Sequence, residues 1–294
     1  MANHNEQNYW INGHIAQALT VDDRGLQYGD GFFTTVAIYE KSILNWPAHW
    51  QRIMHGYATL HMPSPDREVF EQQLADASAA YLNAHQITSC VVKLLFTRGS
   101  GGSGYQAPSV SNENYIFYFK PDNGLILPDT PSILDQVGFS PIKASIHDFA
   151  GLKTLNRLEN VMARTQAVEQ ALSEAIMLNA YGHVVCGTQS NVFMVQGQKV
   201  VTPKLEHSGV AGTCRAQLAL LLNDFGFEYA EETLTRATLE QAEELFFTNA
   251  IRGVQPVRQL EDNALKMENA VLIAEKWHQW QSETATRLST LINS

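Results

Sequence analysis

A segment rich in proline, aspartate, asparagine and glycine, residues 120–131, divides the chain into two stretches with the same alternation of patterns. In both stretches, β-branched and aromatic runs that are typical of strands alternate with runs whose apolar residues recur at helical spacing. The segment between them is typical of a linker, because its residues favour turns. At 294 residues the chain is long enough for two domains. We therefore expect an α/β fold with mixed sheets, with a smaller N-terminal domain over residues 1–121 and a larger C-terminal domain over residues 122–294.

The patterns also predict where the helices and strands lie. In the first stretch we expect strands at 9–15, 33–39, 89–99 and 114–121, a hairpin at 41–46, and helices at 47–62 and 66–85. In the second stretch we expect a strand at 137–142, a long helix from about 155 to 172, several strands within 175–203, a helix at 213–226, a strand at 244–251 and a C-terminal helix.

Composition excludes several classes of protein. The content of 45% hydrophobic and 17% charged residues is that of a globular protein, and the net charge of −10 argues against a nucleic-acid partner or an anionic membrane surface. We find neither a secretory signal nor an apolar run of about 18 residues that would span a membrane. The three cysteines are widely spaced, which is typical of reduced thiols in the cytoplasm, and no pair has zinc-ligand spacing. We therefore expect a cytoplasmic protein without a metal.

Lys153 stands in the segment AGLKTLNRLENV, which otherwise consists largely of apolar residues. Leucines 152, 155 and 158 flank it and favour burial of its side chain. Burial disfavours the charged ammonium, lowers the pKa and frees the amine to act as nucleophile and base. Those are the properties that a Schiff base with an aldehyde cofactor requires. A solvated surface lysine is the alternative, and the residue taken alone does not exclude it.

A phosphate-binding turn is a second candidate. In SGVAGTCRAQLALLL a glycine-rich turn leads directly into an apolar helix, whose first N–H groups could bind a phosphate with help from the Thr213 hydroxyl. An ordinary turn before a helix explains the pattern equally well. Arg52 offers a guanidinium fork to phosphate, although an arginine in a helix is usually a solvated charge. The loops YGDGFF and RGSGGSGY lack the nucleotide-binding patterns.

Seven segments, taken in order, resemble class IV pyridoxal-phosphate enzymes. This family includes branched-chain and D-amino-acid aminotransferases and aminodeoxychorismate lyases. The segments are GDGFFTTV, AHWQRI, RGSGGSGY, AGLKTLNRLENV, SNVF, GVAGTCR and TNAIRGVQPV. RGSGGSGY, LKTLNRLE and the TNAIRGVQPV segment are most similar to the lyases, which split 4-amino-4-deoxychorismate into 4-aminobenzoate and pyruvate for folate synthesis.

The resemblance implies the two-domain fold of these enzymes, pyridoxal 5'-phosphate as cofactor, and a homodimer. It implies that Lys153 forms the Schiff base and that Arg52 binds the phosphate. The phosphate is also expected to meet two backbone turns, one at Thr213 and Cys214 and the other at Asn249 and Ala250. Arg98 and Tyr105, in the glycine-rich loop, are expected to meet the carboxylates of the substrate.

Two positions depart from the family pattern. Cys186 stands where the family usually has a glutamate that faces the pyridine nitrogen, and Ser103 stands where some relatives have an arginine. A carboxylate keeps the ring nitrogen protonated and makes the ring a strong electron acceptor, which amino transfer needs more than elimination does. Cys186 therefore favours a lyase. It could instead be a small buried apolar residue, and an aminotransferase or an inactive cofactor-binding protein are the alternatives.

Overall fold

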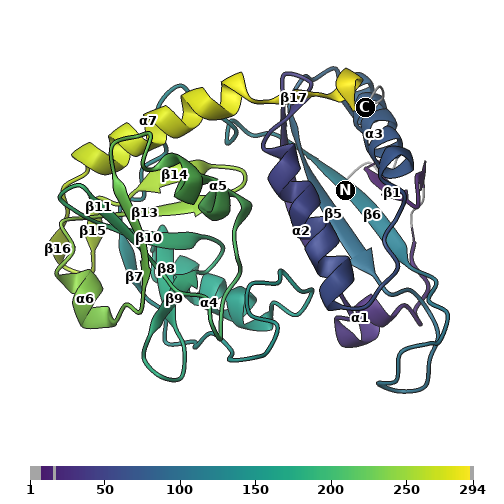
Figure 1. Ribbon diagram of the computed structural model, residues 1–294, viewed down its shortest axis with the longest axis horizontal. Helices are drawn as coiled ribbons and strands as arrows, with labels where there is room; N and C mark the ends of the chain where they lie inside the picture. Colours follow the sequence, from purple (N-terminus) through teal and green to yellow (C-terminus); the bar gives the residue numbers. More distant parts are fainter. Residues whose placement is uncertain (1–7, 16–17, 292–294) are drawn as a thin grey trace. The chain divides into compact units, whose positions relative to one another are not determined.

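The computed structural model describes residues 8–15 and 18–291 and contains two compact units (Figure 1). Unit 1 consists of the described residues up to Ile126, the segment Lys153–Asn156, and residues from Thr284 onward. Unit 2 consists of Leu127–Leu152 and Arg157–Glu283. Among the described helices, none is long and apolar enough to cross a membrane.

Unit 1 is built on one antiparallel sheet of seven strands, with helix α2 packed on β3 and α3 on β6. The strand order is β17-β4-β3-β5-β6-β1-β2. The strands are β1 (Tyr9–Ile11), β2 (His14–Ile15), β3 (Gly31–Tyr39), β4 (Ser42–Ile43), β5 (Cys90–Thr97), β6 (Asn114–Pro121) and β17 (Thr286–Arg287). The helices are α1 (Arg24–Tyr28), α2 (Trp46–Thr59), α3 (Arg67–His85) and the short 3-10 helix η1 (Leu288–Thr290).

Unit 2 contains two five-stranded sheets and four helices. One sheet has the order β12-β11-β10-β13-β14 and the other β16-β15-β7-β8-β9. The strands are β7 (Val137–Phe139), β8 (Glu174–Leu178), β9 (Val184–Gly187), β10 (Asn191–Gln196), β11 (Lys199–Pro203), β12 (Glu228–Glu232), β13 (Glu244–Asn249), β14 (Gly253–Pro256), β15 (Gln259–Leu260) and β16 (Asn263–Ala264). The helices are α4 (Leu158–Glu169), α5 (Thr213–Leu221), α6 (Arg236–Glu240) and α7 (Glu268–Glu283).

The central strands of the first sheet of unit 2 are buried on both faces. Along β10, Val192 packs into a core shared with the second sheet, whereas the next residue, Phe193, packs into a core shared with α5 and α7. The same alternation recurs along β13, where Leu245 and Phe247 face one core and Phe246 faces the other. Because side chains of a strand alternate between faces, a continuous apolar run is what such a strand requires.

The predicted linker contains the boundary between the units, at Ile126 and Leu127, but two segments differ from the predicted domains. Lys153–Asn156 was expected in the C-terminal domain and belongs to unit 1, because its backbone pairs with β3. The described residues from Thr284 to Leu291 also belong to unit 1, because β17 pairs with β4. Both differences arise from long-range strand pairing, which local sequence patterns do not reveal.

The long helices and main strands are confirmed, with two kinds of difference. The helix expected from about residue 155 begins only at Leu158, because Lys153–Leu155 is extended. The shortest elements, such as α1, α6 and β17, were not predicted. They are too short for hydrophobic periodicity to be visible.

Gly56 provides a test of the packing of α2 on β3. A Cβ atom at this position would lie 2.5 Å from the ring of Phe32, which is fully buried and stacked on Phe96. Alanine would gain about 1 kcal/mol from helix propensity, but overpacking a core costs about 1–3 kcal/mol. We expect Gly56→Ala to lower the free energy of unfolding by up to about 2 kcal/mol, measured by urea unfolding. In a Phe32→Leu background the loss should shrink, and a stabilising Gly56→Ala in the otherwise unchanged protein would contradict this packing.

Candidate active site

Lys153 is held in unit 1 by backbone hydrogen bonds to strand β3. The N–H of Phe33 donates to the Lys153 carbonyl at 2.9 Å, and the N–H of Leu155 donates to the Gly31 carbonyl at 3.0 Å. The lysine side chain is half-buried, and its Nζ lies 4.6 Å from the centre of the Phe33 ring. Leu158, which was expected to help bury the lysine, is 73% exposed because it begins α4 and lies outside the extended segment.

A second amine contacts the same ring. Lys93 Nζ, from the neighbouring strand β5, lies 4.4 Å from the centre of Phe33. Burial lowers the pKa of Lys93, and the positive charge of Lys120 lowers it further. Sequence reasoning did not single out Lys93, because a lysine in an otherwise apolar strand is usually an edge or surface charge. It is a natural comparison for Lys153.

Arg52 lies on α2 with its guanidinium turned toward β3. Its Nη1 donates to the Thr34 hydroxyl at 3.4 Å, and the same hydroxyl is hydrogen-bonded at 2.7 Å to Nδ1 of His49, three residues earlier on the helix. Burial lowers the pKa of Arg52 to about 10, which leaves it charged at neutral pH. Burial, together with the charge of Arg52, lowers the pKa of His49 to about 3, so this imidazole is neutral. The result is a half-buried cation with a neutral neighbour, a setting that favours binding of an anion.

In unit 2, helix α5 begins without a side-chain cap. Its N-cap is Gly212, so no side chain at that position accepts from the N–H groups of the first turn, to which Thr213 and Cys214 belong. The preceding loop is fixed by Asn191, whose Nδ2 donates to the Val210 carbonyl at 2.9 Å. A Cβ atom on Gly212 would lie 2.1 Å from Oδ1 of Asn191, so only glycine fits this turn. The helix start therefore presents N–H donors and a positive dipole end.

The end of β13 lies beside the start of α5, because the two elements pack together and Cys214 lies close to Thr248. Burial raises the pKa of Cys214, so its thiol is neutral, and this residue can bind an anion only through its backbone. The next residue, Asn249, closes a turn by accepting hydrogen bonds on Oδ1 from the N–H groups of Ile251 at 3.0 Å and Arg252 at 2.8 Å. Ala250 lies within that turn. The four residues predicted to form two backbone turns are thus neighbours in unit 2.

The chain that leads to Lys153 pairs with the loop before α5. The N–H of Gly151 donates to the Gly209 carbonyl, and the N–H of Ala211 donates back to the Gly151 carbonyl, each at 3.0 Å. Gly151 has a φ of +91°, a conformation that glycine adopts without strain. This pairing fixes the residue two positions before Lys153.

Cys186 is buried on β9, opposite Met177 of β8, and packs in a small cluster that includes Ala163 of α4. Arg157 lies close enough to interact with it electrostatically. Burial lowers the pKa of Arg157, and the charge of Glu159 opposes that effect. Sequence reasoning missed Arg157, although it lies within the segment quoted for Lys153.

Glu174 is a second residue that sequence reasoning missed. Its carboxylate is buried and accepts hydrogen bonds from the Thr188 N–H at 2.9 Å and from the Ser190 hydroxyl at 2.7 Å. These bonds fix the turn that joins β9, which carries Cys186, to β10, which begins at Asn191. A lone acidic residue at the head of the apolar run EAIML was the available signal.

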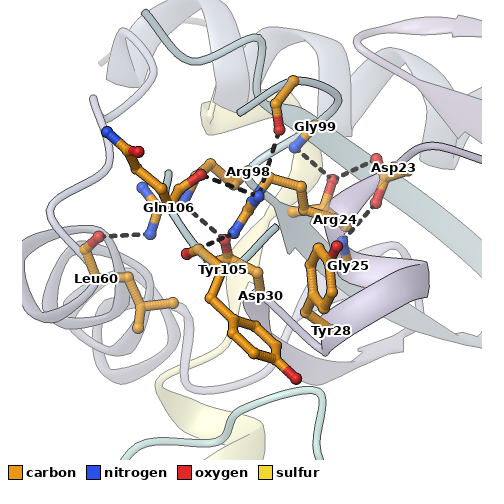
Figure 2. A network of polar contacts seen from close by, with 12 residues as sticks. Asp23, Arg24, Gly25, Tyr28, Asp30, Leu60, Arg98, Gly99, Tyr105 and Gln106 are labelled. Carbon is orange, nitrogen blue, oxygen red and sulfur yellow. Dashed lines mark hydrogen bonds and ion pairs between the residues drawn. The ribbon is translucent and has the colours of Figure 1, made fainter. Parts of the chain in front are cut away.

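The two residues of the glycine-rich loop occupy different settings in unit 1 (Figure 2). Arg98 is buried; its Nε donates to Asp30 and its Nη2 to the Leu60 carbonyl, both at 2.8 Å. It also lines a cavity of about 550 Å³. Tyr105 is 90% exposed and its ring meets that of Tyr28 edge-on, with centres 5.5 Å apart. Ser103 is exposed in the same loop.

Comparison with known proteins identifies the family. Residues 31–260 match the model described as amino-transferase class IV. An aminodeoxychorismate lyase of Vibrio harveyi is 32% identical over 255 residues, which cover 85% of this chain and 90% of that protein. The crystal structure of 4-amino-4-deoxychorismate lyase from Pseudomonas aeruginosa superimposes with a TM-score of 0.81 at 30% identity, over 94% of this chain and 98% of that one. A putative branched-chain-amino-acid aminotransferase of Methanocaldococcus jannaschii is 27% identical over 264 residues, 88% of each chain. The chain belongs to the class IV aminotransferase family.

Proposed function

We propose that this protein is a pyridoxal-phosphate-dependent lyase that converts 4-amino-4-deoxychorismate into 4-aminobenzoate and pyruvate, a step of folate synthesis. The observation that supports the proposal is sequence identity over nearly the whole chain, which is higher with two lyases than with an aminotransferase relative. Identity is 32% and 30% with two lyases and 27% with the aminotransferase relative. Cys186, in place of the carboxylate that amino transfer favours, supports the same choice.

The residues present fit the cofactor. A phosphate dianion suits the start of α5, where Gly212 provides no side-chain cap and the dipole end is positive. It also suits the half-buried guanidinium of Arg52. The turn at Asn249 and Ala250 would add backbone donors. Pyridoxal phosphate, when bound, supplies an aldehyde that lysine can bind covalently and a ring that accepts electrons.

Lys153 is proposed to bind that aldehyde and to act on two protons. Its amine would take the proton from the amine-bearing ring carbon of the substrate and return a proton to the departing enolpyruvyl fragment. Contact with Phe33 holds the amine in place between these steps, and a cation over an aromatic face contributes about 0.5–1 kcal/mol at exposed sites.

Arg98 and Tyr105 are proposed to meet the substrate. Arg98 lines a cavity, and together with Arg24 it shares the single carboxylate of Asp30, so the three groups carry one net positive charge at neutral pH. That charge suits a substrate with two carboxylates. Tyr105 offers an exposed hydroxyl and ring from the loop.

The decisive experiment is an assay of the purified, cofactor-loaded protein with aminodeoxychorismate, in which 4-aminobenzoate and pyruvate should form in equal amounts. Parallel assays use D-alanine or branched-chain amino acids with 2-oxoglutarate. Faster amino transfer than elimination would identify an aminotransferase instead. Cofactor binding without turnover of either substrate would identify an inactive binding protein.

Lys153→Ala should lower elimination by at least about 100-fold, because proton transfer by a positioned group contributes that much or more. Lys93→Ala is the matched control, since both amines contact Phe33; it should retain activity. After borohydride treatment, mass spectrometry should find the cofactor covalently attached to the peptide that contains Lys153. Attachment to Lys93, or full activity of Lys153→Ala, would contradict the assignment.

Cys186→Glu should increase amino transfer relative to elimination. Arg157, which interacts with Cys186, would partner the new carboxylate and limit the cost of burying it. A shift of one pKa unit in the ring nitrogen corresponds to about tenfold, so we expect the ratio of pyridoxamine phosphate formed to 4-aminobenzoate formed to rise by about tenfold. Cys186→Gln is equal in size but neutral and should leave the ratio unchanged. Nitrogen-15 NMR of labelled cofactor gives an independent measurement, and a protonated ring nitrogen in the unmodified protein would refute the electronic argument.

A homodimer is proposed on the resemblance to the family and on one surface of unit 2. Exposed apolar residues on α4 fall on one side of the helix: Leu158, Val161, Met162 and Val168. A helix that exposes such a stripe to water usually covers it with a partner.

The three cysteines are free and buried, which suits the proposed cytoplasmic location.

Val161→Glu should therefore weaken the dimer, because a buried unpaired charge at the centre of an interface is strongly unfavourable. We expect the dissociation constant to rise by roughly 30-fold or more, measured by sedimentation or light scattering. Val69→Glu on α3 is the control, since Val69 is similarly exposed and is a single apolar residue. Equal dimerisation of both variants would exclude the α4 surface.

A further inference from the structure

The buried side chain of Arg24 holds the glycine-rich loop of unit 1 (Figure 2). Arg24 belongs to the short helix α1, far from the loop in sequence, and its side chain is only 4% exposed. Its Nη1 donates to the carbonyls of Gly101 at 3.3 Å, Gly104 at 3.0 Å and Gln106 at 3.3 Å, and its Nη2 donates to the carbonyl of Tyr105 at 3.2 Å. One guanidinium therefore donates hydrogen bonds to four carbonyls within six consecutive residues.

The orientation of this guanidinium is itself fixed on two sides. Its Nε donates to Asp30 at 2.9 Å, and its Cζ lies over the ring of Tyr28, 4.9 Å from the ring centre. Asp30 also accepts from Arg98, so the residue immediately before the loop is tied to the same carboxylate. Burial by itself would raise the pKa of Asp30, but the hydrogen bonds from Arg98 and Arg24 outweigh it and hold the pKa below its usual range. The anchor is therefore ionised at neutral pH.

The loop needs such an anchor because its own backbone provides little order. Its four glycines, residues 99, 101, 102 and 104, all have positive φ, a conformation that other residues rarely adopt. Its internal pairing is limited to Ser103 and Gln106, whose N–H groups donate to each other's carbonyls at 3.3 and 3.0 Å. Most of its side chains are exposed. A glycine-rich exposed loop has high conformational entropy, which the donors of Arg24 offset.

We infer that Arg24 is a positioning residue that fixes the glycine-rich loop over residues 99–106 and so sets the place of Tyr105 beside Tyr28 for substrate binding. The part that concerns substrate rests on the proposed function; the part that concerns the loop does not. Lysine could not replace arginine here, because an ammonium lacks the planar fork that reaches a carboxylate and several carbonyls at once.

Hydrogen exchange of the full-length protein tests the loop directly. In Arg24→Lys, the amides of Ser103 and Gln106 should exchange at least about tenfold faster, because hydrogen bonds to a charged group are lost. Amides of β3 and β5 should exchange as in the unmodified protein, which verifies that the variant is folded. Arg67→Lys is the control, since Arg67 forms an ion pair with Glu71 with 56% of its own side chain exposed. Unchanged exchange of the loop in Arg24→Lys would overturn the inference.

A second variant disturbs the hydrogen bonds between Arg24 and the loop by a change in the loop, and leaves the buried Arg24 in place. A Cβ atom on Gly102 would lie 2.3 Å from the Gln106 carbonyl and 3.1 Å from Nη1 of Arg24, so Gly102→Ala should displace that carbonyl and accelerate exchange as Arg24→Lys does. Gly124→Ala is its control, because Gly124 also has a positive φ but has open space around it. If Arg24→Lys fails to fold, Gly102→Ala decides the question alone.

Kinetics test the link to substrate. Arg24→Lys and Gly102→Ala should retain the cofactor spectrum and raise KM for aminodeoxychorismate by about tenfold with a much smaller change in kcat, as expected when binding to substrate and transition state is weakened equally. Faster loop exchange with an unchanged KM would overturn the role in substrate binding. If the unmodified protein does not act on aminodeoxychorismate, the proposed function fails, while the exchange results still decide whether Arg24 fixes the loop.

Discussion

The backbone pairing of Lys153–Leu155 with β3 is the interaction on which the proposed site depends. The Lys153 carbonyl accepts from Phe33, and Leu155 donates to Gly31, so the main chain determines where the lysine stands. Because successive side chains of an extended segment point to opposite faces, the amine of Lys153 reaches the Phe33 ring while Thr154 is buried on the other side. These bonds involve backbone atoms only, so the identity of the side chain at position 153 can govern chemistry without governing the fold.

Charged groups with little exposure occur in both units, and each is balanced in a different way. Glu174 is surrounded by hydrogen-bond donors, and Asp30 by two guanidinium groups. The pKa of the Asp30 carboxyl is lowered in the folded protein, so its ionised form stabilises the fold at neutral pH. This stabilisation is lost as the pH falls through the pKa that Asp30 has in the folded protein. Arg52 differs, since its pKa is lowered by burial, which means that the fold alone does not favour its charge. An arginine in that condition is suited to an anionic ligand.

The sequence predicts local features well, namely the type of the longer helices and strands and the residue Lys153. Helices α2 and α3 and strands β3, β5 and β6 have enough periodic residues for their type to be visible, and Lys153 stands out because an amine interrupts an apolar segment. Arg52, Thr213 and Asn249 are ambiguous by themselves, and only the family resemblance selects them. The pairing of β17 with β4 and the reach of Arg24 to a loop about 80 residues away depend on tertiary contacts. A motif such as DDRGLQYGD, with an arginine between acids and glycines, gives no hint of which carbonyls that arginine will bind.

The two units order the segments proposed to bind ligands by different means, and the difference bears on the proposed specificity. In unit 2, the turn before α5 is held by backbone pairing and by Asn191, with so little room that a Cβ atom on Gly212 cannot be accommodated. Such a turn suits a cofactor that never changes. In unit 1, four carbonyls within residues 101–106 of the loop are bound by one long side chain, and the sequence of this part can vary provided that its carbonyls still reach Arg24. A family that keeps its cofactor and changes its substrate needs a rigid turn for the cofactor and a loop whose sequence can vary for the substrate. A loop that is held through its backbone carbonyls allows such variation.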